Sequence, residues 1–254
     1  MKAIIIAAGK GSRLEHLTTE KPKCLVEVDG KSILQHQLDA YRANDVHDIH
    51  IVKGYLHEKI DLPDITYYVN HDFENNNILH SLMHAEDAMD DCFISSYSDI
   101  IFEPDVVRRV LESEADIALA VDKDWKTQYV DRTLHTPEEA EKVVHDENGH
   151  VIHVGKRIDA HIDDVHGEYI GLFKCSGESA PLFRDYFRKA TREFSGLPFI
   201  KSADFQQAFV TDLLMYMIAD GVRVSCELID GGWHEIDTLE DVDRVRAQRE
   251  SDPQ

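Results

Sequence analysis

Short apolar runs alternate with amphipathic segments along the first half of the chain. Runs with the length and residue content of buried strands occur at 3–7, 48–52, 65–69, 92–97 and 115–121. Segments with apolar positions at helical spacing lie between them at 32–44, 75–88 and 103–112. This alternation predicts an α/β fold with a Rossmann-like, doubly wound sheet that is mixed but mostly parallel.

The pattern changes after residue 121. The segment 122–174 is polar at first and contains a hairpin, with strands near 141–145 and 150–155 and a turn at Asn148-Gly149. With a return strand at 167–173, it predicts an antiparallel excursion that walls a pocket; an ordinary surface hairpin is the alternative. The remaining pattern predicts helices at 179–194 and 204–220, a strand at 222–229 and a final helix to about residue 248, all within one domain, 1–254.

The first apolar run breaks into a loop of small residues, Ala8-Gly9-Lys10-Gly11-Ser12-Arg13. Its glycines relieve the steric limits on the backbone, so amide N–H groups can approach a ligand, most commonly a phosphate. Leu14 excludes the dinucleotide fingerprint, which needs a third glycine there, and the Ser12-Arg13 pair excludes a Walker-type loop. Arg13 and Lys23 add positive charge beyond the loop. We therefore predict nucleotide binding here; a plain glycine turn between strand and helix is the alternative.

Two aspartates stand at strand ends that are far apart in the chain. Asp99 follows the run at 92–97, and Asp237 lies in the segment 231–238, to which the late strand at 222–229 leads. Ligands of open α/β sheets bind beyond the carboxyl ends of the strands, so we expect both carboxylates at one sheet edge, facing the phosphates. The structural alternatives are that Asp99 forms a turn and that Asp237 and Thr238 cap the final helix.

Composition narrows the class of function. The 254 residues carry a formal net charge of −22, from 49 acidic and 27 basic side chains. This balance argues against binding to nucleic acid or to an anionic membrane, because both need a basic surface. The four cysteines form no CxxC pair, and no apolar stretch has the length of a membrane span, so we expect a cytoplasmic protein with reduced thiols. The fifteen histidines form no HExxH pattern, and we interpret them as surface and hairpin residues.

The opening pattern of strand, AAGxGxR and Pro-Lys resembles the start of the sugar-1-phosphate and phosphocholine nucleotidyltransferases. Four later segments are closest to the phosphocholine- and phosphonate-type cytidylyltransferases of this sugar-nucleotidyltransferase-like superfamily: NNNILHSL at 75–82, SDI at 98–100, EYIGL at 168–172 and WHEIDT at 233–238. The resemblance extends over nearly the whole chain. It implies a Mg²⁺-dependent enzyme that transfers CMP from CTP to a small phosphonate or phosphate acceptor and releases pyrophosphate.

The resemblance also implies roles for individual residues. The nucleotide would be bound by Ala7, Ala8, Gly9, Gly11, Ser12, Arg13, Asn76 and Ser81. Asp99 and Asp237 would hold Mg²⁺, while Arg13 and Lys23 would be the catalytic cations on the phosphates. The acceptor would contact Arg132, Lys156, Glu168 and Gly171. Two departures from the family pattern are Ser98 in place of a glycine, and Gly155-Lys156-Arg157 in place of Glu-Lys-Pro.

Two other functions remain as alternatives. One is a sugar-1-phosphate nucleotidyltransferase that uses dTTP or UTP, against which the missing Glu-Lys-Pro segment and the short chain count. The other is a nucleotide-binding regulatory protein without turnover. The joint presence of Arg13, Lys23, Asp99 and Asp237 argues against it, because a protein that only binds nucleotide needs no second acidic metal ligand.

Overall fold

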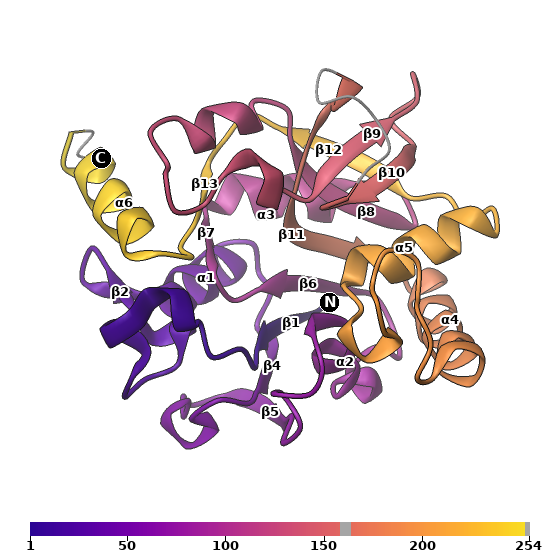
Figure 1. Cartoon of the computed structure of the whole chain (residues 1–254), viewed down its shortest axis with the longest axis horizontal. Helices are drawn as coiled ribbons and strands as arrows, with labels where there is room; N and C mark the ends of the chain where they lie inside the picture. Colours follow the sequence, from indigo (N-terminus) through magenta and orange to yellow (C-terminus); the bar gives the residue numbers. More distant parts are fainter. Residues whose placement is uncertain (158–163, 252–254) are drawn as a thin grey trace.

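The computed structural model describes residues 1–157 and 164–251 (Figure 1). A mixed sheet forms its centre. One half of this sheet is parallel and contains, in spatial order, β5 (Ile65–Val69), β4 (Asp48–Lys53), β1 (Lys2–Ala7) and β6 (Phe93–Tyr97). Residues 3–7 of β1 are buried because helices cover both faces of the strand, as its run of isoleucines predicts.

The other half of the sheet is joined to the first through β11 (Gly167–Cys175), which pairs antiparallel with β6. It also contains β8 (Ile117–Asp122), β9 (Lys142–His145), β10 (Val151–Gly155) and β12 (Ser225–Ile229). β11 pairs antiparallel with β8 and β9, whereas β12 pairs in parallel with β8. The predicted α/β fold with a mixed sheet and an antiparallel hairpin is therefore confirmed. The β9–β10 hairpin extends the sheet through β11 instead of leaving it.

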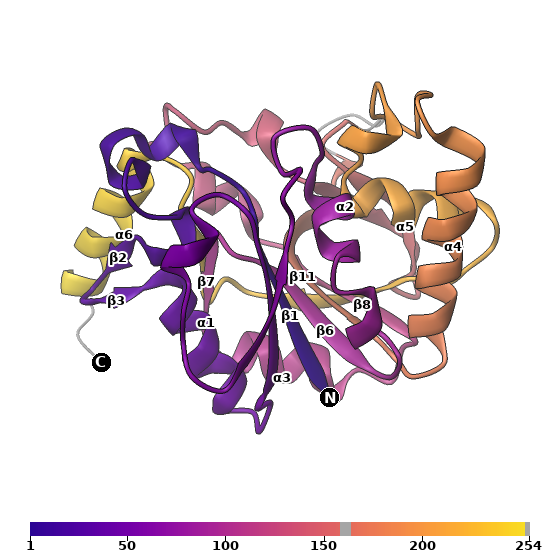
Figure 2. The same ribbon diagram turned by 90° about the horizontal axis from the view of Figure 1, so that it is seen from below.

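Helices cover both faces of the sheet, with α1 on the side opposite to α4 and α5 (Figure 2). Their bounds are α1 (Ile33–Arg42), α2 (Ile78–Met83), α3 (Pro104–Glu112), α4 (Ser179–Phe194) and α5 (Val210–Ala219). α1 and α3 pack with Ala3, Ile5 and Ala7 of β1, while α2, α4 and α5 pack with Ile4 and Ile6. Successive side chains of a strand point to opposite faces, so β1 contributes to both cores.

Smaller elements connect the C-terminal segment to the loop after β1. One two-stranded antiparallel sheet pairs β7 (Ile100–Phe102) with β13 (Trp233–Glu235), and another pairs β2 (Glu27–Val28) with β3 (Lys31–Ser32). The last helix, α6 (Leu239–Ser251), follows β13. Its Val242 and Val245 pack with Leu14 and Ile236 in a separate apolar cluster. This cluster anchors the loop after β1 against the end of the chain.

Short 3₁₀ turns occupy several connections. They lie at Ser12–Thr18, Lys23–Leu25, His57–Lys59, Glu86–Ala88, Trp125–Tyr129, Pro137–Glu139 and Phe205–Gln207. The helix expected over 75–88 is consequently divided, because α2 ends at Met83 and residues 86–88 form a separate turn. Across the described residues, none of the helices combines the length and the apolar character needed to cross a membrane.

The helix expected over 204–220 is also broken. Ala208 and Phe209 are extended and separate a 3₁₀ turn from α5, which begins at Val210. The carboxylate of Asp212 accepts a hydrogen bond from the backbone N–H of Phe209 at 2.9 Å. Side-chain acceptors of this kind satisfy the free N–H groups at a helix start, so the new helix is capped where the turn ends. The apolar periodicity continues through this point and gave no sign of the break.

Candidate active site

The loop after β1 allows a lysine to reach the centre of the site. Gly11 has a φ of 64°, in the left-handed region that favours glycine. A Cβ at this position would lie 2.7 Å from Cβ of Lys23, so the glycine leaves room for the lysine side chain. Lys23 begins a 3₁₀ turn after Pro22 and is only 8% exposed. Leu14, at the position of the third glycine in dinucleotide-binding motifs, is fully buried under α6.

Asp99 and Asp237 are brought together by the small β7–β13 sheet. Asp99 precedes β7, and Asp237 follows β13 after one intervening residue. The strands pair with Ile100 opposite Glu235, and the N–H of Ile236 donates to the carbonyl of Asp99 at 2.8 Å. The aspartates therefore meet through this separate pair of strands, and not at neighbouring strand ends of the main sheet.

Lys23 lies between the two carboxylates. Its ammonium is 2.9 Å from Oδ2 of Asp99 and also contacts Asp237, whose other oxygen contacts Arg13. Burial alone would lower the pKa of Lys23, but the charges of Asp99 and Asp237 outweigh it and raise that pKa above its ordinary value. Burial would raise the pKa of Asp237, yet Lys23, a hydrogen bond from His135 and Arg13 hold it well below its usual range. Lys23 and Asp237 are therefore both charged at neutral pH.

The same carboxylates suit a hard divalent cation. Oδ1 of Asp99 is buried and has no hydrogen-bond partner within residues 1–157 and 164–251, so one acceptor of the pair is available. His135, Glu235 and Asp237 also place one ligand atom each within 4.8 Å of one another. Mg²⁺ prefers oxygen ligands and is commonly held by one or two carboxylates together with substrate phosphates. The residues present therefore fit this ion.

The interpretation of the histidines as surface and hairpin residues is wrong for His135. This side chain is only 2% exposed, with Nδ1 3.0 Å from Oδ2 of Asp237 and Nε2 3.4 Å from Oε2 of Glu235. It comes from the polar stretch that follows β8, where the sequence pattern carries no signal of burial. Its role in holding both carboxylates depends on the tertiary fold, which no local pattern indicates.

A cavity of about 290 Å³ opens beside the loop after β1. Lys23, Asp99 and Asp237 line it, together with most residues predicted to bind the nucleotide: Ala8, Gly9, Gly11, Ser12, Arg13, Asn76 and Ser81. Ala7 is the exception, because it is buried at the end of β1 and does not line the cavity. The structure thus gathers the glycine loop and the asparagine-rich segment around one space.

A buried asparagine that no sequence pattern singled out holds two of these residues. Asn70 directly follows β5 and is fully buried. Its Nδ2 donates to Oδ1 of Asn76 at 2.9 Å and to Oγ of Ser81 at 3.0 Å. Asn77 has a different role, because its side-chain oxygen accepts from the N–H of Ile78 at the start of α2. Asn76 and Asn77 therefore both line the cavity, and Asn77 also caps the helix.

A second cavity, of about 220 Å³, adjoins the first. The two cavities share Arg13, Asn77, Ile78, Tyr97, Asp99 and Asp237. Lys156, Glu168 and Gly171, which were predicted to contact the acceptor, line the second one. Gly171 has a φ of 85°, and a Cβ there would lie 2.5 Å from an atom of the Tyr97 ring. This glycine therefore makes room for Tyr97 and also lines the cavity in which the acceptor was expected.

Arg132, the fourth residue predicted to contact the acceptor, does not line this cavity. Its side chain is fully buried, with Nε 2.8 Å from Oδ1 of Asp241 and a terminal nitrogen 3.4 Å from Oε2 of Glu235. Asp241 also accepts from the backbone N–H groups of Asp237 and Thr238, at 3.0 and 2.8 Å. The charge of Arg132 is thus paired with buried carboxylates that support the Asp237 loop. The prediction that Arg132 contacts the acceptor is therefore wrong.

Buried carboxylates form one wall of the second cavity. Glu141 accepts from the hydroxyls of Tyr97 at 3.0 Å and Thr211 at 2.8 Å, and burial raises its pKa to about 7. Glu168 accepts from the Tyr129 hydroxyl at 2.6 Å, and its burial raises its pKa well above the ordinary value. Its Oε2 is buried without a hydrogen-bond partner in the described part of the chain. This wall offers acceptor atoms to a hydrogen-bond donor or a cation.

Known proteins resemble this chain over about half to nearly all of its length. The MobA-like NTP transferase domain matches residues 3–171. A CTP:phosphoglutamine cytidylyltransferase of Campylobacter jejuni is 30% identical over 96% of this chain and 98% of its own. A UTP–glucose-1-phosphate uridylyltransferase of Haloferax volcanii is 38% identical over 49% of this chain and 56% of its own. The solved CTP:phosphocholine cytidylyltransferase of Streptococcus pneumoniae shares the fold, with a TM-score of 0.74 and 19% identity over 97% of this chain and 98% of that one.

Proposed function

Because this chain belongs to the MobA-like NTP transferase family, we propose that it is a cytidylyltransferase that transfers CMP from CTP to a small phosphonate or phosphate acceptor. One observation carries the proposal. Lys23 lies between Asp99 and Asp237, and these two carboxylates line both adjoining cavities. The cavity beside the glycine loop would hold CTP and the second one the acceptor, so the reacting atoms would meet at the shared residues.

The proposed reaction needs alignment more than proton transfer. An oxygen of the acceptor phosphate or phosphonate attacks the α-phosphorus of CTP, a new P–O bond forms, and the bond to the β-phosphate breaks to release pyrophosphate. The attacking oxygen is already anionic, so no general base is required. Lys23 would screen the repulsion between the two anions, and Arg13 would neutralise charge on the triphosphate. Asp99 and Asp237 would hold Mg²⁺, which when bound neutralises negative charge on the phosphates.

The relatives support the choice of nucleotide and the class of acceptor. The Campylobacter jejuni and Streptococcus pneumoniae proteins both use CTP by name, with phosphoglutamine and phosphocholine as their acceptors. Here the second cavity combines Glu141 and Glu168 with the aromatic rings of Tyr97, Tyr169 and Trp233. Ring faces attract cations, and a cation bound beside Glu141 and Glu168 would favour the ionised form of these carboxyls, whose pKa values burial raises. We therefore propose an acceptor with an amine or quaternary ammonium group beside its phosphate or phosphonate.

Pyrophosphate release tests the proposal. CTP, UTP, dTTP and ATP are each offered with Mg²⁺ and with phosphocholine, phosphoethanolamine, 2-aminoethylphosphonate, 2-hydroxyethylphosphonate or glucose 1-phosphate. We expect release with CTP and an amine-bearing acceptor, and its loss in Asp99→Asn. The matched control is Asp105→Asn, an exposed aspartate in the first turn of α3.

Other outcomes of this screen favour the alternatives. Release with UTP or dTTP and glucose 1-phosphate alone would favour a sugar-1-phosphate nucleotidyltransferase, as the Haloferax volcanii relative is named. Binding of CTP without turnover of any acceptor would favour a nucleotide-binding regulatory protein.

A further inference from the structure

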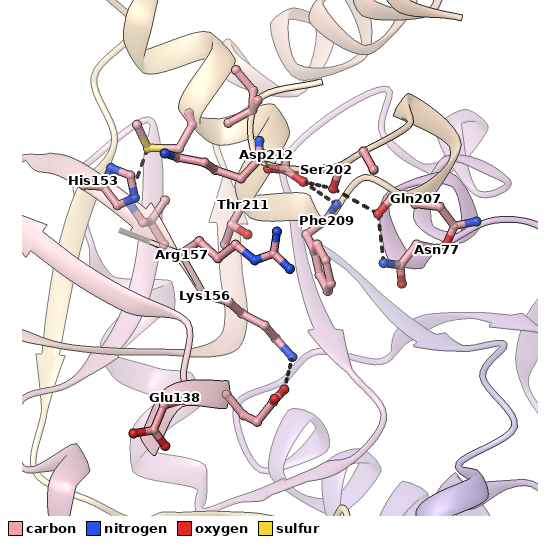
Figure 3. Close-up of a pocket in the computed structure, with 17 residues that line it drawn as sticks. Asn77, Glu138, His153, Lys156, Arg157, Ser202, Gln207, Phe209, Thr211 and Asp212 are labelled. Carbon is pink, nitrogen blue, oxygen red and sulfur yellow. Dashed lines mark hydrogen bonds and ion pairs between the residues drawn. The ribbon is translucent and has the colours of Figure 1, made fainter. Parts of the chain in front are cut away.

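A third cavity, of about 470 Å³, lies beyond the acceptor cavity (Figure 3). Its walls come from the end of β10, the loop at 200–203 and the start of α5. It shares Asn77, Glu139, Lys156 and Phe209 with the acceptor cavity. Thr211, on its wall, donates to Glu141 on the wall of the acceptor cavity. The two spaces therefore adjoin, and a molecule longer than a simple phosphonate can extend from one into the other.

Arg157 supplies positive charge to this outer cavity. Figure 3 shows its guanidinium directed into the space, towards Phe209. Within the described ranges the Arg157 side chain has neither a hydrogen bond nor an ion pair, and the side chain is exposed. A guanidinium presents a planar fork of donors that matches a carboxylate bidentately.

The acidic residues of the cavity are already engaged. Asp212 accepts from the backbone N–H groups of Phe209 and Lys201 and, at 2.7 Å, from the Ser202 hydroxyl. Glu139 pairs with Lys156 at 3.3 Å. Glu138 hydrogen-bonds Thr136, and Figure 3 shows its carboxylate directed away from Arg157. Among the residues that the structure describes, none of these carboxylates pairs with Arg157, although the whole chain carries a net charge of −22.

Phe209 is the apolar residue common to the two cavities, and further apolar side chains line the outer one. The ammonium of Lys156 lies 5.4 Å from the centroid of the Phe209 ring, and Ile200, Met215 and Val154 contribute aliphatic surface. Such a surface suits the methylene groups of a linear acceptor, while Arg157 suits a negative charge at its far end.

We propose that the outer cavity is a distal subsite of the acceptor pocket, in which Arg157 binds a carboxylate at the end of the acceptor opposite to its phosphate or phosphonate. This inference rests on the proposed function and extends it. The favoured acceptors are amino acids with a phosphate or phosphonate on the side chain, with the amine against the carboxylate wall and the carboxylate at Arg157.

Paired acceptors that differ only in a carboxylate test this subsite. 2-Amino-4-phosphonobutanoate is 3-aminopropylphosphonate with one carboxylate added, and 2-amino-5-phosphonopentanoate pairs with 4-aminobutylphosphonate in the same way. We expect kcat/KM with CTP to favour the carboxylate-bearing member of a pair by about tenfold. Arg157→Gln should remove this preference through a higher KM for that member, leaving the other member and kcat unchanged. Arg157→Lys should retain part of the preference.

Two controls separate the subsite from the proposed function. Arg108→Gln replaces an exposed arginine on α3 that is not among the lining residues of the three cavities. This variant should retain the preference. Calorimetric binding of each phosphonate pair is measured alongside turnover. If no acceptor is turned over but Arg157 still discriminates in binding, the subsite stands and the transferase proposal fails. If CMP transfer occurs and Arg157→Gln changes both members of a pair equally, or neither, the subsite is overturned while the function stands.

Discussion

At the scale of single residues, the site depends on contacts between side chains that the sequence pattern does not predict. The glycine loop was expected to admit phosphate, and its Gly11 also leaves space for the stem of Lys23. Glu141 belongs to a predicted hairpin strand and was not expected in the site. It lies buried on the wall of the acceptor cavity, between Tyr97 and Thr211. Substitutions at Gly11 and Glu141 test two separate features: the space that Gly11 leaves for Lys23, and the protonation of the buried Glu141 carboxyl.

Gly11→Ala should reduce kcat/KM far more than Gly9→Ala. A Cβ at Gly11 would meet Lys23 at 2.7 Å in a left-handed backbone conformation, whereas a Cβ at Gly9 meets nothing within 4 Å. Displacing one positioned cation should lower the rate of pyrophosphate release by on the order of 100-fold. Steady-state kinetics measure the effect, and circular dichroism checks that both variants are folded. Equal kinetics in the two variants would contradict the proposed position of Lys23.

Glu141 should make stability depend on pH. The folded protein keeps this carboxyl protonated up to a pKa of about 7, while the unfolded chain loses the proton near its ordinary 4.5. The folded state therefore binds more protons in this window, and stability falls as pH rises through it. Relative to the wild type, Glu141→Gln should gain on the order of 3 kcal/mol in unfolding free energy between pH 4.5 and pH 8.

Urea unfolding at pH 5 and pH 8 measures this difference. Glu147→Gln, at an exposed position in the turn of the same hairpin, is the matched control and should follow the wild type at both values. A pH-independent difference between Glu141→Gln and the wild type would show that Glu141 is not held protonated in the fold.

At the scale of elements, α6 and its cap hold the Asp237 loop. Asp241 is fully buried, receives hydrogen bonds from Asp237 and Thr238 and pairs with Arg132. Thr238 therefore caps α6 as the structural alternative expected, since its hydroxyl accepts from the N–H of Asp241 at 3.4 Å, and the Asp241 carboxylate accepts from the N–H groups of Asp237 and Thr238 in return. Asp237 is left free to contact Lys23, Arg13 and His135.

Asp241→Asn should destabilise the protein and impair the site together. The amide retains an acceptor for the backbone but breaks the closer ion pair of the buried Arg132 guanidinium, which keeps only Glu235 at 3.4 Å. Removing one partner of a buried ion pair commonly costs about 3–5 kcal/mol. Asp243→Asn changes an exposed aspartate of the same helix and should have little effect. Thermal unfolding and pyrophosphate release are measured on both variants. Unchanged stability in Asp241→Asn would show that Arg132 does not depend on this partner.

Element positions followed from the sequence where local rules decide them. The five early strands and α1, α3 and α4 lie close to their expected positions, because apolar runs, helical spacing and the Ser32 cap determine them locally. The start of α5 was missed because it depends on a side-chain cap by Asp212. The burial of His135 and Arg132 was missed for a related reason: their partners lie in segments distant along the chain, so no periodicity or spacing reports the contact. Asn70 was missed although its partner Asn76 is near in the chain, because a single asparagine after a strand carries no signal of burial.

At the scale of the whole molecule, acidic surface surrounds a site that contains paired charges. The 49 acidic and 27 basic residues give the chain a net charge of −22, which repels itself and disfavours the compact state. The ion pairs of Lys23 and Arg132 are largely buried, so salt screens them less than it screens the surface.

Salt should therefore stabilise the protein. Raising KCl from about 0.1 M to about 1 M shortens the Debye length from about 10 Å to about 3 Å and weakens surface repulsion. We expect Tm to rise with KCl, by about 2–4 °C for each kcal/mol gained. Sucrose at equal osmolality is the control for effects other than charge. A Tm that falls with KCl would show that surface repulsion does not limit the stability of this fold.

The identity of the product tests the central claim most directly. The wild-type chain is incubated with CTP, Mg²⁺ and 2-amino-4-phosphonobutanoate or phosphocholine, and the reaction is followed by ³¹P NMR. The account predicts a CMP-linked anhydride of the acceptor and one pyrophosphate for each CTP consumed, both absent in Asp99→Asn and Asp237→Asn. CTP that stays intact with every acceptor, or orthophosphate in place of pyrophosphate, would contradict it.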